Sequence, residues 1–333
     1  MPAIPSWLLP QPSVDLSLLK KINSRNNMFS IQTYVNTLIH ERYGYYVHIF
    51  TDGSKNPENG KTSCAFYIPE LKVKVFKRLT DHLSIYTAEI MAIMLALYWI
   101  EEVKPLRILI CSDSSAALTS LKNTLSKCRE DIMLENLLSL YRVRNLGIDV
   151  QFLWIPAHSG IKGNEMADSL AKKGLTINGV EVKVPISKTE IKSYIRSKIK
   201  VQWQKLWDNG NKGRHLYGIQ QKVGEEEPLG KSRREQGMFS RIRLGHTRLN
   251  ASLHVIGKHP TGKCDMCSQP ETIEHVLFEY IKYASQRIDL RKGLEHEGIK
   301  QLDIKNIFSN KSRKTVLKIM SSYLQQTGLN LRI

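Results

Sequence analysis

The stretch WIPAHSGIKGNEMAD, residues 154–168, joins an apolar strand end, a loop bounded by Pro156 and Gly160, and the first turns of a helix. A single histidine, His158, lies in the loop, and Asp168 follows it inside the predicted helix. A histidine on a loop and an acid on the next helix have no obvious structural reason to occur as a pair. Three further carboxylates, which precede them in the chain, supply a reason.

The sequence around this stretch predicts an α/β domain. Apolar and β-branched segments separated by turn residues indicate strands at 45–52, 63–68, 72–79, 107–113 and 150–155. Helical periodicity and helix-length apolar composition indicate helices at 87–103, 114–125, 132–144 and 165–174. Three strands followed by alternating helices and strands predict a mixed five-stranded sheet with flanking helices.

The composition excludes several classes of protein. With 41% hydrophobic and 24% charged residues the chain is expected to fold, and it has no run of about 18 apolar residues that would span a membrane. The N-terminus lacks the basic and apolar regions of a signal peptide. Five cysteines, an odd count without framework spacing, favour a reducing compartment. We therefore expect an intracellular protein, nuclear or cytoplasmic, with no membrane partner.

The net charge of +18 is concentrated in the second half of the chain. Residues 1–175 hold 20 Lys and Arg against 16 Asp and Glu, whereas residues 176–333 hold 29 against 15. Such asymmetry favours a polyanionic partner, although a merely soluble basic surface is the alternative. We expect a lead-in segment at 1–40, the α/β domain at 41–176, and a basic, mainly helical C-terminal region at 177–333.

Four carboxylates lie at predicted strand ends and helix starts. Asp52 and Asp113 each end a strand, Glu89 is the only charged residue between residues 87 and 100, and Asp168 flanks an apolar helix stripe. Each acid alone has an ordinary explanation as a turn, cap or surface residue. Together they predict a cluster of carboxylates with no lysine or arginine between them. A hard cation such as Mg²⁺ or Mn²⁺ would relieve the repulsion among these carboxylates.

The motifs that carry these acids resemble type 1 ribonuclease H. They are TDGS at 51–54, TAE at 87–89, SDS at 112–114 and the stretch 154–168. The resemblance covers about residues 45–175 and is strongest to the ribonuclease H region of non-LTR (LINE-like) retrotransposon polyproteins. The segments 5–19 and 241–254 also resemble flanking parts of such polyproteins. No Tyr/Phe-x-Asp-Asp signature of a reverse transcriptase occurs, so we expect a C-terminal fragment or a stand-alone derivative.

The resemblance implies a ribonuclease H-like fold and a two-metal mechanism. Asp52, Glu89, Asp113 and Asp168 would hold two Mg²⁺ ions, with Asp52 bridging both and Mn²⁺ as a substitute. His158 would act as a proton shuttle on its glycine-containing loop. The implied activity is endonucleolytic hydrolysis of the RNA strand of RNA/DNA hybrids. A catalytically weak or inactive nucleic-acid-binding protein is the alternative, and cleavage of another duplex such as DNA is a third.

The sequence departs from the family where substrate is bound. Many cellular members have amide side chains just before the helix glutamate and just after the strand aspartate, where this chain has Ser84-Ile85 and Ser114-Ser115. The span between Asp113 and His158 is also short for a basic protrusion. We expect nucleic-acid contacts from Ser54, Ser84, Ser115, Asn164, Arg241, Arg243 and Arg248. The three arginines can equally belong to a solvated helix face.

A second motif lies in the C-terminal region, at residues 264–280. The spacing Cys264-x₂-Cys267-x₇-His275-x₄-Tyr280 resembles a C-x₂-C…H-x₄-C zinc knuckle, with tyrosine in place of the last cysteine. Cys264, Cys267 and His275 are therefore candidate Zn²⁺ ligands, with His259 as a conceivable fourth. A degenerate knuckle that packs without metal is the alternative. The sequence does not predict an oligomeric state.

Overall fold

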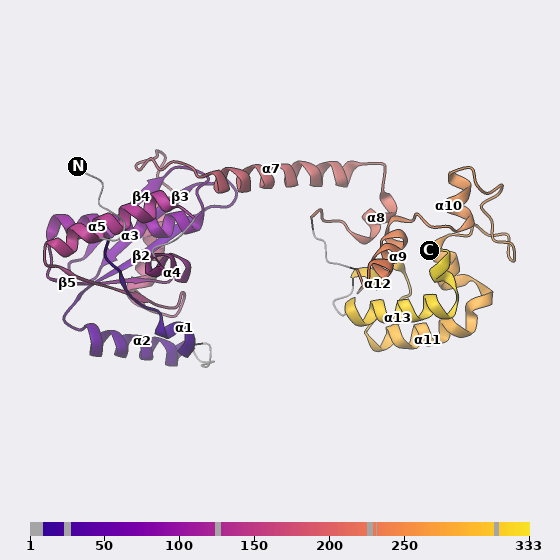
Figure 1. Ribbon diagram of the computed structural model, residues 1–333, viewed down its shortest axis with the longest axis horizontal. Helices are drawn as coiled ribbons and strands as arrows, with labels where there is room; N and C mark the ends of the chain where they lie inside the picture. Colours follow the sequence, from indigo (N-terminus) through magenta and orange to yellow (C-terminus); the bar gives the residue numbers. More distant parts are fainter. Residues whose placement is uncertain (1–8, 23–27, 124–127, 225–228, 231, 310–312) are drawn as a thin grey trace. The chain divides into compact units, whose positions relative to one another are not determined.

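The structure of the protein is a computed structural model that describes residues 9–22, 28–123, 128–224, 229–230, 232–309 and 313–333. The rest of the predicted lead-in segment, residues 1–8 and 23–27, lies outside these ranges. The chain divides into two compact units, Met1–Ile195 and Arg196–Ile333. Figure 1 shows a sheet with helices in the first unit and only helices and loops in the described part of the second.

A mixed sheet forms the centre of the first unit. Its strands are β1 (Ser13–Asp15), β2 (Val47–Lys55), β3 (Thr62–Ile68), β4 (Val73–Leu79), β5 (Arg107–Ser112) and β6 (Asp149–Trp154). The spatial order is β1-β6-β5-β2-β3-β4. The strands β1, β6, β5 and β2 are parallel to one another, and β3 is antiparallel to both β2 and β4. The predicted mixed α/β fold is confirmed.

The prediction of five strands is wrong by one. The sixth strand, β1, belongs to the predicted lead-in and pairs its three residues with Gln151–Leu153 of β6. A strand of three residues is too short to carry an alternating pattern, and it forms because the edge of β6 offers unpaired backbone groups. The lead-in is thus part of the sheet.

Helices cover both faces of this sheet. They are α1 (Ser17–Ile22), α2 (Met28–Tyr43), α3 (Ile85–Val103), α4 (Ser115–Asn123), α5 (Glu130–Asn145) and α6 (Lys162–Gly174). Successive residues of a strand face opposite sides, so Ile110 of β5 packs with α3, α4 and α5, whereas its neighbours Leu109 and Cys111 pack with α1, α2 and α6. Figure 1 shows α3 and α5 on one side of the sheet and α2 on the other.

A glycine sets the distance between β2 and α3. A Cβ atom at Gly53 would lie 2.7 Å from the Glu89 backbone nitrogen and 2.8 Å from the Ala88 carbonyl carbon. Both neighbours are backbone atoms that cannot move aside, so only glycine permits this approach. Since Asp52 precedes Gly53, the close approach places the first two predicted acids beside each other.

The second unit is mainly helical, as predicted. The helix α7 (Lys188–Asn209) runs from the first unit into it, and its further helices are α8 (Arg214–Ile219), α9 (Arg233–Leu244), α10 (Asn250–Val255), α11 (Ala284–His296), α12 (Ile304–Ser309) and α13 (Arg313–Gln326). Short helical turns occur at His275–Glu279, Ile281–Tyr283 and Leu329–Leu331. The core includes Phe239 and Ile242 of α9, Leu294 of α11 and Met320 of α13. Within the described ranges, no helix is long and apolar enough to cross a membrane.

Candidate active site

One pocket in the first unit brings all five predicted catalytic residues together. It is lined by Asp52, Gly53, Glu89, Asp113, Ser114, Ala157, His158, Asn164, Glu165 and Asp168. These residues come from β2, from α3, from the end of β5, from the loop after β6, and from α6. Segments far apart in the sequence therefore meet at a single site.

The sheet explains why the acids meet. Strands β2 and β5 are parallel neighbours, and Thr51 pairs with Ser112 at the level where both approach the pocket. Asp52 and Asp113 follow these two residues directly. Glu89 is added by α3, which lies against β2 at Gly53. Carboxyl ends of adjacent parallel strands are where sheet proteins commonly place their sites.

Three carboxylates form a compact buried cluster. Asp52, Glu89 and Asp113 each offer an oxygen atom, and these atoms lie within 4.8 Å of one another. Asp52 is 6% exposed and Glu89 is 7% exposed. The Oε2 atom of Glu89 is buried and has no hydrogen-bond partner. A buried carboxylate oxygen without a donor is costly, so this oxygen-only cluster fits a hard divalent cation.

The cluster resists ionisation on its own. Burial, together with the nearby Asp113 and Asp168, raises the pKa of Asp52 to about 8. Burial and then the Asp52 charge raise the pKa of Glu89 well above its usual value, and burial also raises the pKa of Asp113. A raised carboxyl pKa means that the folded protein retains a proton near neutral pH. A bound cation would reverse this preference, because it favours the ionised acids.

Asp168 lines the same pocket but is paired with a lysine. Its Oδ2 accepts a hydrogen bond from Lys172 Nζ at 2.7 Å, one turn further along α6. The Asp168 carboxylate is not part of the group of three that converge. Its negative charge still reaches them, since it helps to raise the pKa of Asp52, which Lys172 in turn lowers.

Two side chains fix Asp113 in place. Asn164 donates from Nδ2 to the Oδ2 of Asp113 at 2.9 Å, and Trp154 donates from Nε1 to the Asp113 backbone oxygen at 3.0 Å. Asn164 is only 3% exposed. The sequence predicted Asn164 as a nucleic-acid contact, which stays a prediction, and the structure shows in addition that it binds a cluster acid. Its spacing from Asp168 gave no indication of this partner.

His158 is exposed at the rim of the pocket on a loop that is held at both sides. His158 has a φ of 49° and Gly160 a φ of 78°, both in the left-handed region. The next residue, Ser159, is buried and donates from Oγ to the Pro156 carbonyl at 2.8 Å. Gln32 of α2 donates from Nε2 to the Gly160 carbonyl at 2.6 Å. The lead-in thus supports the His158 loop, which no local sequence pattern could have predicted.

The comparison with protein families agrees with this geometry. Residues 45–176 match the family model described as RNase H. This part of the chain is an RNase H domain. A comparison of the chain with curated proteins gave no match. The presence of this domain supports an activity that hydrolyses the RNA strand of RNA/DNA hybrids. It therefore supports a nuclease that binds such hybrids.

Three other residues of the RNase H domain that were predicted to contact nucleic acid, Ser54, Ser84 and Ser115, do not line the pocket. Ser84 caps α3 by accepting from the Thr87 backbone N–H, Ser115 begins α4, and Ser54 lies in β2. Their binding to nucleic acid stays a prediction. Ser114 and Glu165 line the pocket instead. Glu165 precedes Asp168 by one helical turn, and this spacing was a signal that sequence reasoning overlooked.

The arginines predicted to bind nucleic acid lie in the second unit, away from the RNase H domain in sequence. Arg241 donates from Nη1 to the Ile333 carbonyl at 2.9 Å, and Arg243 donates from Nη2 to the Gln220 Oε1 atom. The backbone N–H of Arg248 bonds to the Arg332 carbonyl. Both Arg241 and Arg243 thus help to hold the second unit together, and contact with nucleic acid stays a prediction.

The predicted zinc ligands also converge in the second unit. Ligand atoms of Cys264, Cys267 and His275 lie within 4.8 Å of one another, with 3.3 Å between Cys267 Sγ and His275 Nε2. Burial opposes ionisation of Cys264, but the Met266 and Cys267 backbone N–H groups lower its pKa to about 7. Tyr280 packs beside His275, with their ring centroids 5.5 Å apart, so it lies next to the three ligands.

His259 is engaged elsewhere. Its Nδ1 atom accepts hydrogen bonds from the backbone N–H groups of Thr261 and Gly262 at 3.4 and 2.9 Å. It is not part of the converging group in the described part of the chain. The structure therefore favours Tyr280 over His259 as the neighbour of Cys264, Cys267 and His275.

We expect Lys172→Ala to lower the Mg²⁺ concentration that half-saturates the RNase H domain, by roughly two- to fivefold, because Asp168 loses a competing cation. The concentration is measured by thermal stabilisation of the full chain without nucleic acid. Lys173→Ala is the matched control, since Lys173 lies over the Phe76 ring rather than against Asp168. A higher or unchanged Mg²⁺ requirement in Lys172→Ala contradicts this role for the lysine.

Proposed function

We propose that the protein is a Mg²⁺-dependent endonuclease of the type 1 ribonuclease H class, which cleaves the RNA strand of RNA/DNA hybrids by two-metal-ion catalysis. The observation that carries the proposal is the buried group of Asp52, Glu89 and Asp113, with the unpartnered Glu89 oxygen inside it. Asp168 and His158 line the same pocket. The residues fit the oxygen ligation that Mg²⁺ prefers, with Mn²⁺ as a substitute.

Each protein group has a distinct part in this proposal. Two Mg²⁺ ions, when bound, supply activation of the attacking water and stabilisation of the leaving 3′ oxygen. Asp52, Glu89, Asp113 and Asp168 would hold them, and Asn164 orients Asp113 by donating to its Oδ2 atom. Asp168, which now accepts a hydrogen bond from Lys172, would have to give up that bond to hold a cation. The exposed imidazole of His158 would give a proton from a ring nitrogen to the leaving 3′ oxygen and regain one from solvent.

The second half of the chain is proposed to hold the substrate. Its surplus of 29 Lys and Arg over 15 Asp and Glu in residues 176–333 supports attraction to phosphates. Such binding weakens steeply with salt. We also propose an origin in a non-LTR retrotransposon polyprotein, which rests on the resemblance of segments 5–19 and 241–254 and of the motifs between them.

Cleavage of a labelled RNA/DNA hybrid by the full chain tests the activity. We expect Mg²⁺-dependent cutting of the RNA strand, with matched double-stranded RNA and DNA left intact. Asp113→Asn is expected to lower the rate by at least about a hundredfold, because it removes a ligand charge while keeping the side-chain volume. Asp149→Asn, which lies on β6 outside the pocket, is the control expected to cut normally.

Two other outcomes have distinct meanings. Salt-sensitive binding of the hybrid without cutting would replace the proposal with the alternative, a nucleic-acid-binding protein whose acids are a retained scaffold. Equal cutting of DNA duplexes would retain the nuclease and reject its preference for hybrids.

We further propose that Cys264, Cys267 and His275 bind one Zn²⁺ ion, with Tyr280 beside the fourth position. Support comes from the convergence of the three ligand atoms and from the lowered pKa of Cys264, which favours the thiolate that zinc requires. Such a site would tie the loop at 264–267 to the helical turn at His275–Glu279.

Cobalt titration of the full chain tests the zinc proposal. We expect the absorption of a tetrahedral Co²⁺–thiolate centre, its loss in Cys267→Ser, and its retention in Cys128→Ser, which changes a cysteine outside the group. Tyr280→Cys is expected to tighten binding at least about tenfold, because it supplies a fourth N/S ligand. A wild-type spectrum without thiolate bands rejects the site.

A further inference from the structure

The chain continues to pack against the RNase H domain after the family match ends at residue 176. The backbone N–H groups of Glu181 and Val182 both donate to the Arg78 carbonyl of β4, at 2.9 and 3.0 Å. Val184 is buried, and its N–H donates to the Thr80 Oγ1 atom at 2.8 Å. This pairing runs along the sheet edge and brings the first turn of α7 to the beginning of α3.

The first turn of α7 carries a capping box formed by Ser187 and Glu190. Ser187 Oγ accepts from the Glu190 N–H at 3.3 Å, and Glu190 Oε2 accepts from the Ser187 N–H at 2.9 Å. The acid of a capping box needs only one of its oxygens for this bond. Glu190, however, is only 6% exposed, so its other oxygen faces protein rather than water.

That other oxygen binds the beginning of α3. Glu190 Oε1 accepts from the Ser84 backbone N–H at 2.6 Å and from the Thr87 hydroxyl at 2.7 Å. The helix α3 has no acidic residue in its own first turn. A carboxylate at a helix N-terminus satisfies free N–H groups and complements the helix dipole. Glu190 thus supplies, from beyond the family match, the anion that α3 lacks.

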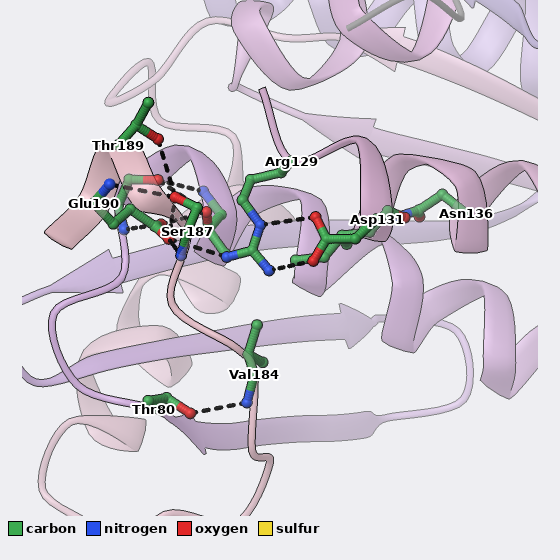
Figure 2. Close-up of polar contacts among 11 residues, drawn as sticks. Thr80, Arg129, Asp131, Asn136, Val184, Ser187, Thr189 and Glu190 are labelled. Carbon is green, nitrogen blue, oxygen red and sulfur yellow. Dashed lines mark hydrogen bonds and ion pairs between the residues drawn. The ribbon is translucent and has the colours of Figure 1, made fainter. Parts of the chain in front are cut away.

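A buried arginine completes the contact, as Figure 2 shows. Arg129 donates from Nη1 to Glu190 Oε2 at 3.0 Å, and its Nε and Nη2 atoms bond both oxygens of Asp131 at 3.0 and 2.8 Å. The Arg129 side chain is 1% exposed. Although burial opposes ionisation of Glu190, its donors hold its pKa at about 2. The contact is therefore a fully paired joint between α3, α5 and α7.

This joint lies next to a metal-binding candidate. Glu89 follows Thr87 by two residues on α3, and its Oε2 atom has no hydrogen-bond partner. The position of Glu89 therefore depends on the placement of its helix. We propose that Glu190 is a positioning residue, which sets the beginning of α3 and through it the Glu89 carboxylate. The inference rests on the proposed function, and it makes residues 177–190 part of the catalytic unit.

The test compares Glu190→Gln with Glu181→Gln in the full chain. Glu181 lies in the same segment, and its carboxylate binds Lys77 and the Arg78 N–H rather than α3. We expect Glu190→Gln to lower kcat on the hybrid by roughly ten- to hundredfold, with KM unchanged within about twofold, because misplaced catalytic groups impair turnover more than binding. The Mg²⁺ concentration for half-saturation should rise several-fold. Glu181→Gln should change neither quantity.

A second variant covers failure of Glu190→Gln to fold. Thr87→Val removes one donor to Glu190 and keeps both the volume and the ion pair with Arg129. It should shift kcat and the Mg²⁺ requirement in the same direction, by a smaller factor. The inference is overturned if folded Glu190→Gln has the wild-type kcat and the wild-type Mg²⁺ requirement, even when its melting temperature falls. If Glu190→Gln does not fold, the same result for Thr87→Val overturns it.

The positioning role of Glu190 can still be tested if the wild-type protein does not cut the hybrid. In that case the proposed function fails, and the positioning role is judged by Mg²⁺-induced thermal stabilisation and by hydrogen exchange of the backbone amides at residues 85–89. Weaker Mg²⁺ stabilisation with faster exchange in Glu190→Gln supports the role. Unchanged values reject it.

Discussion

The fold has to hold three buried carboxyl groups in one small site, although they repel one another when they are ionised. Asp52, Glu89 and Asp113 lie within 4.8 Å of one another, and burial raises the pKa of each. Such a group would separate if its supports were flexible. It is held because β2 and β5 are adjacent in the sheet, because Gly53 lets α3 approach, and because Asn164 binds Asp113. The fold thus holds the acids in an arrangement whose electrostatic cost a bound divalent cation would remove.

The supports of this group reach beyond the RNase H domain as its family match defines it. Gln32, before the match, bonds the loop that carries His158. Glu190, after it, bonds the beginning of the helix that carries Glu89. Both belong to the first compact unit, Met1–Ile195. The unit that prepares the site is therefore longer than residues 45–176, and Figure 2 shows how closely the later segment is joined to it.

The sequence predicted the parts of the site that depend on local pattern. Residues next to predicted strand ends, such as Asp52 and Asp113, were found because strand and turn signals are local, and their cluster followed from sheet geometry. The strand β1 was missed because three residues carry too little pattern. The partners of Asn164 and Gln32 were missed because a side-chain hydrogen bond across the fold depends on positions that only packing fixes.

In the basic C-terminal region, too, the sequence predicted features that depend on local pattern but not the contacts that packing fixes. Its mainly helical character was predicted without the bounds of its helices, and the Cys264, Cys267 and His275 spacing identified three groups that the fold brings together. Charge alone, however, did not say which arginines are free to bind phosphate. Arg241 and Arg243 are both engaged in hydrogen bonds within the second unit. A count of charges indicates a polyanionic partner but not the surface that meets it.

We expect the acid cluster to retain a proton in the absence of a divalent cation and to release it when one binds. Calorimetric titration of Mg²⁺ into the full chain at pH 7, in two buffers with different ionisation enthalpies, measures the protons released on binding. Since the pKa of Asp52 is about 8 and that of Glu89 is raised well above its usual value, we expect release of at least about one proton per chain, with the Asp52 contribution falling as the pH is raised above about 8. Binding without proton release, or no binding of Mg²⁺, would contradict it.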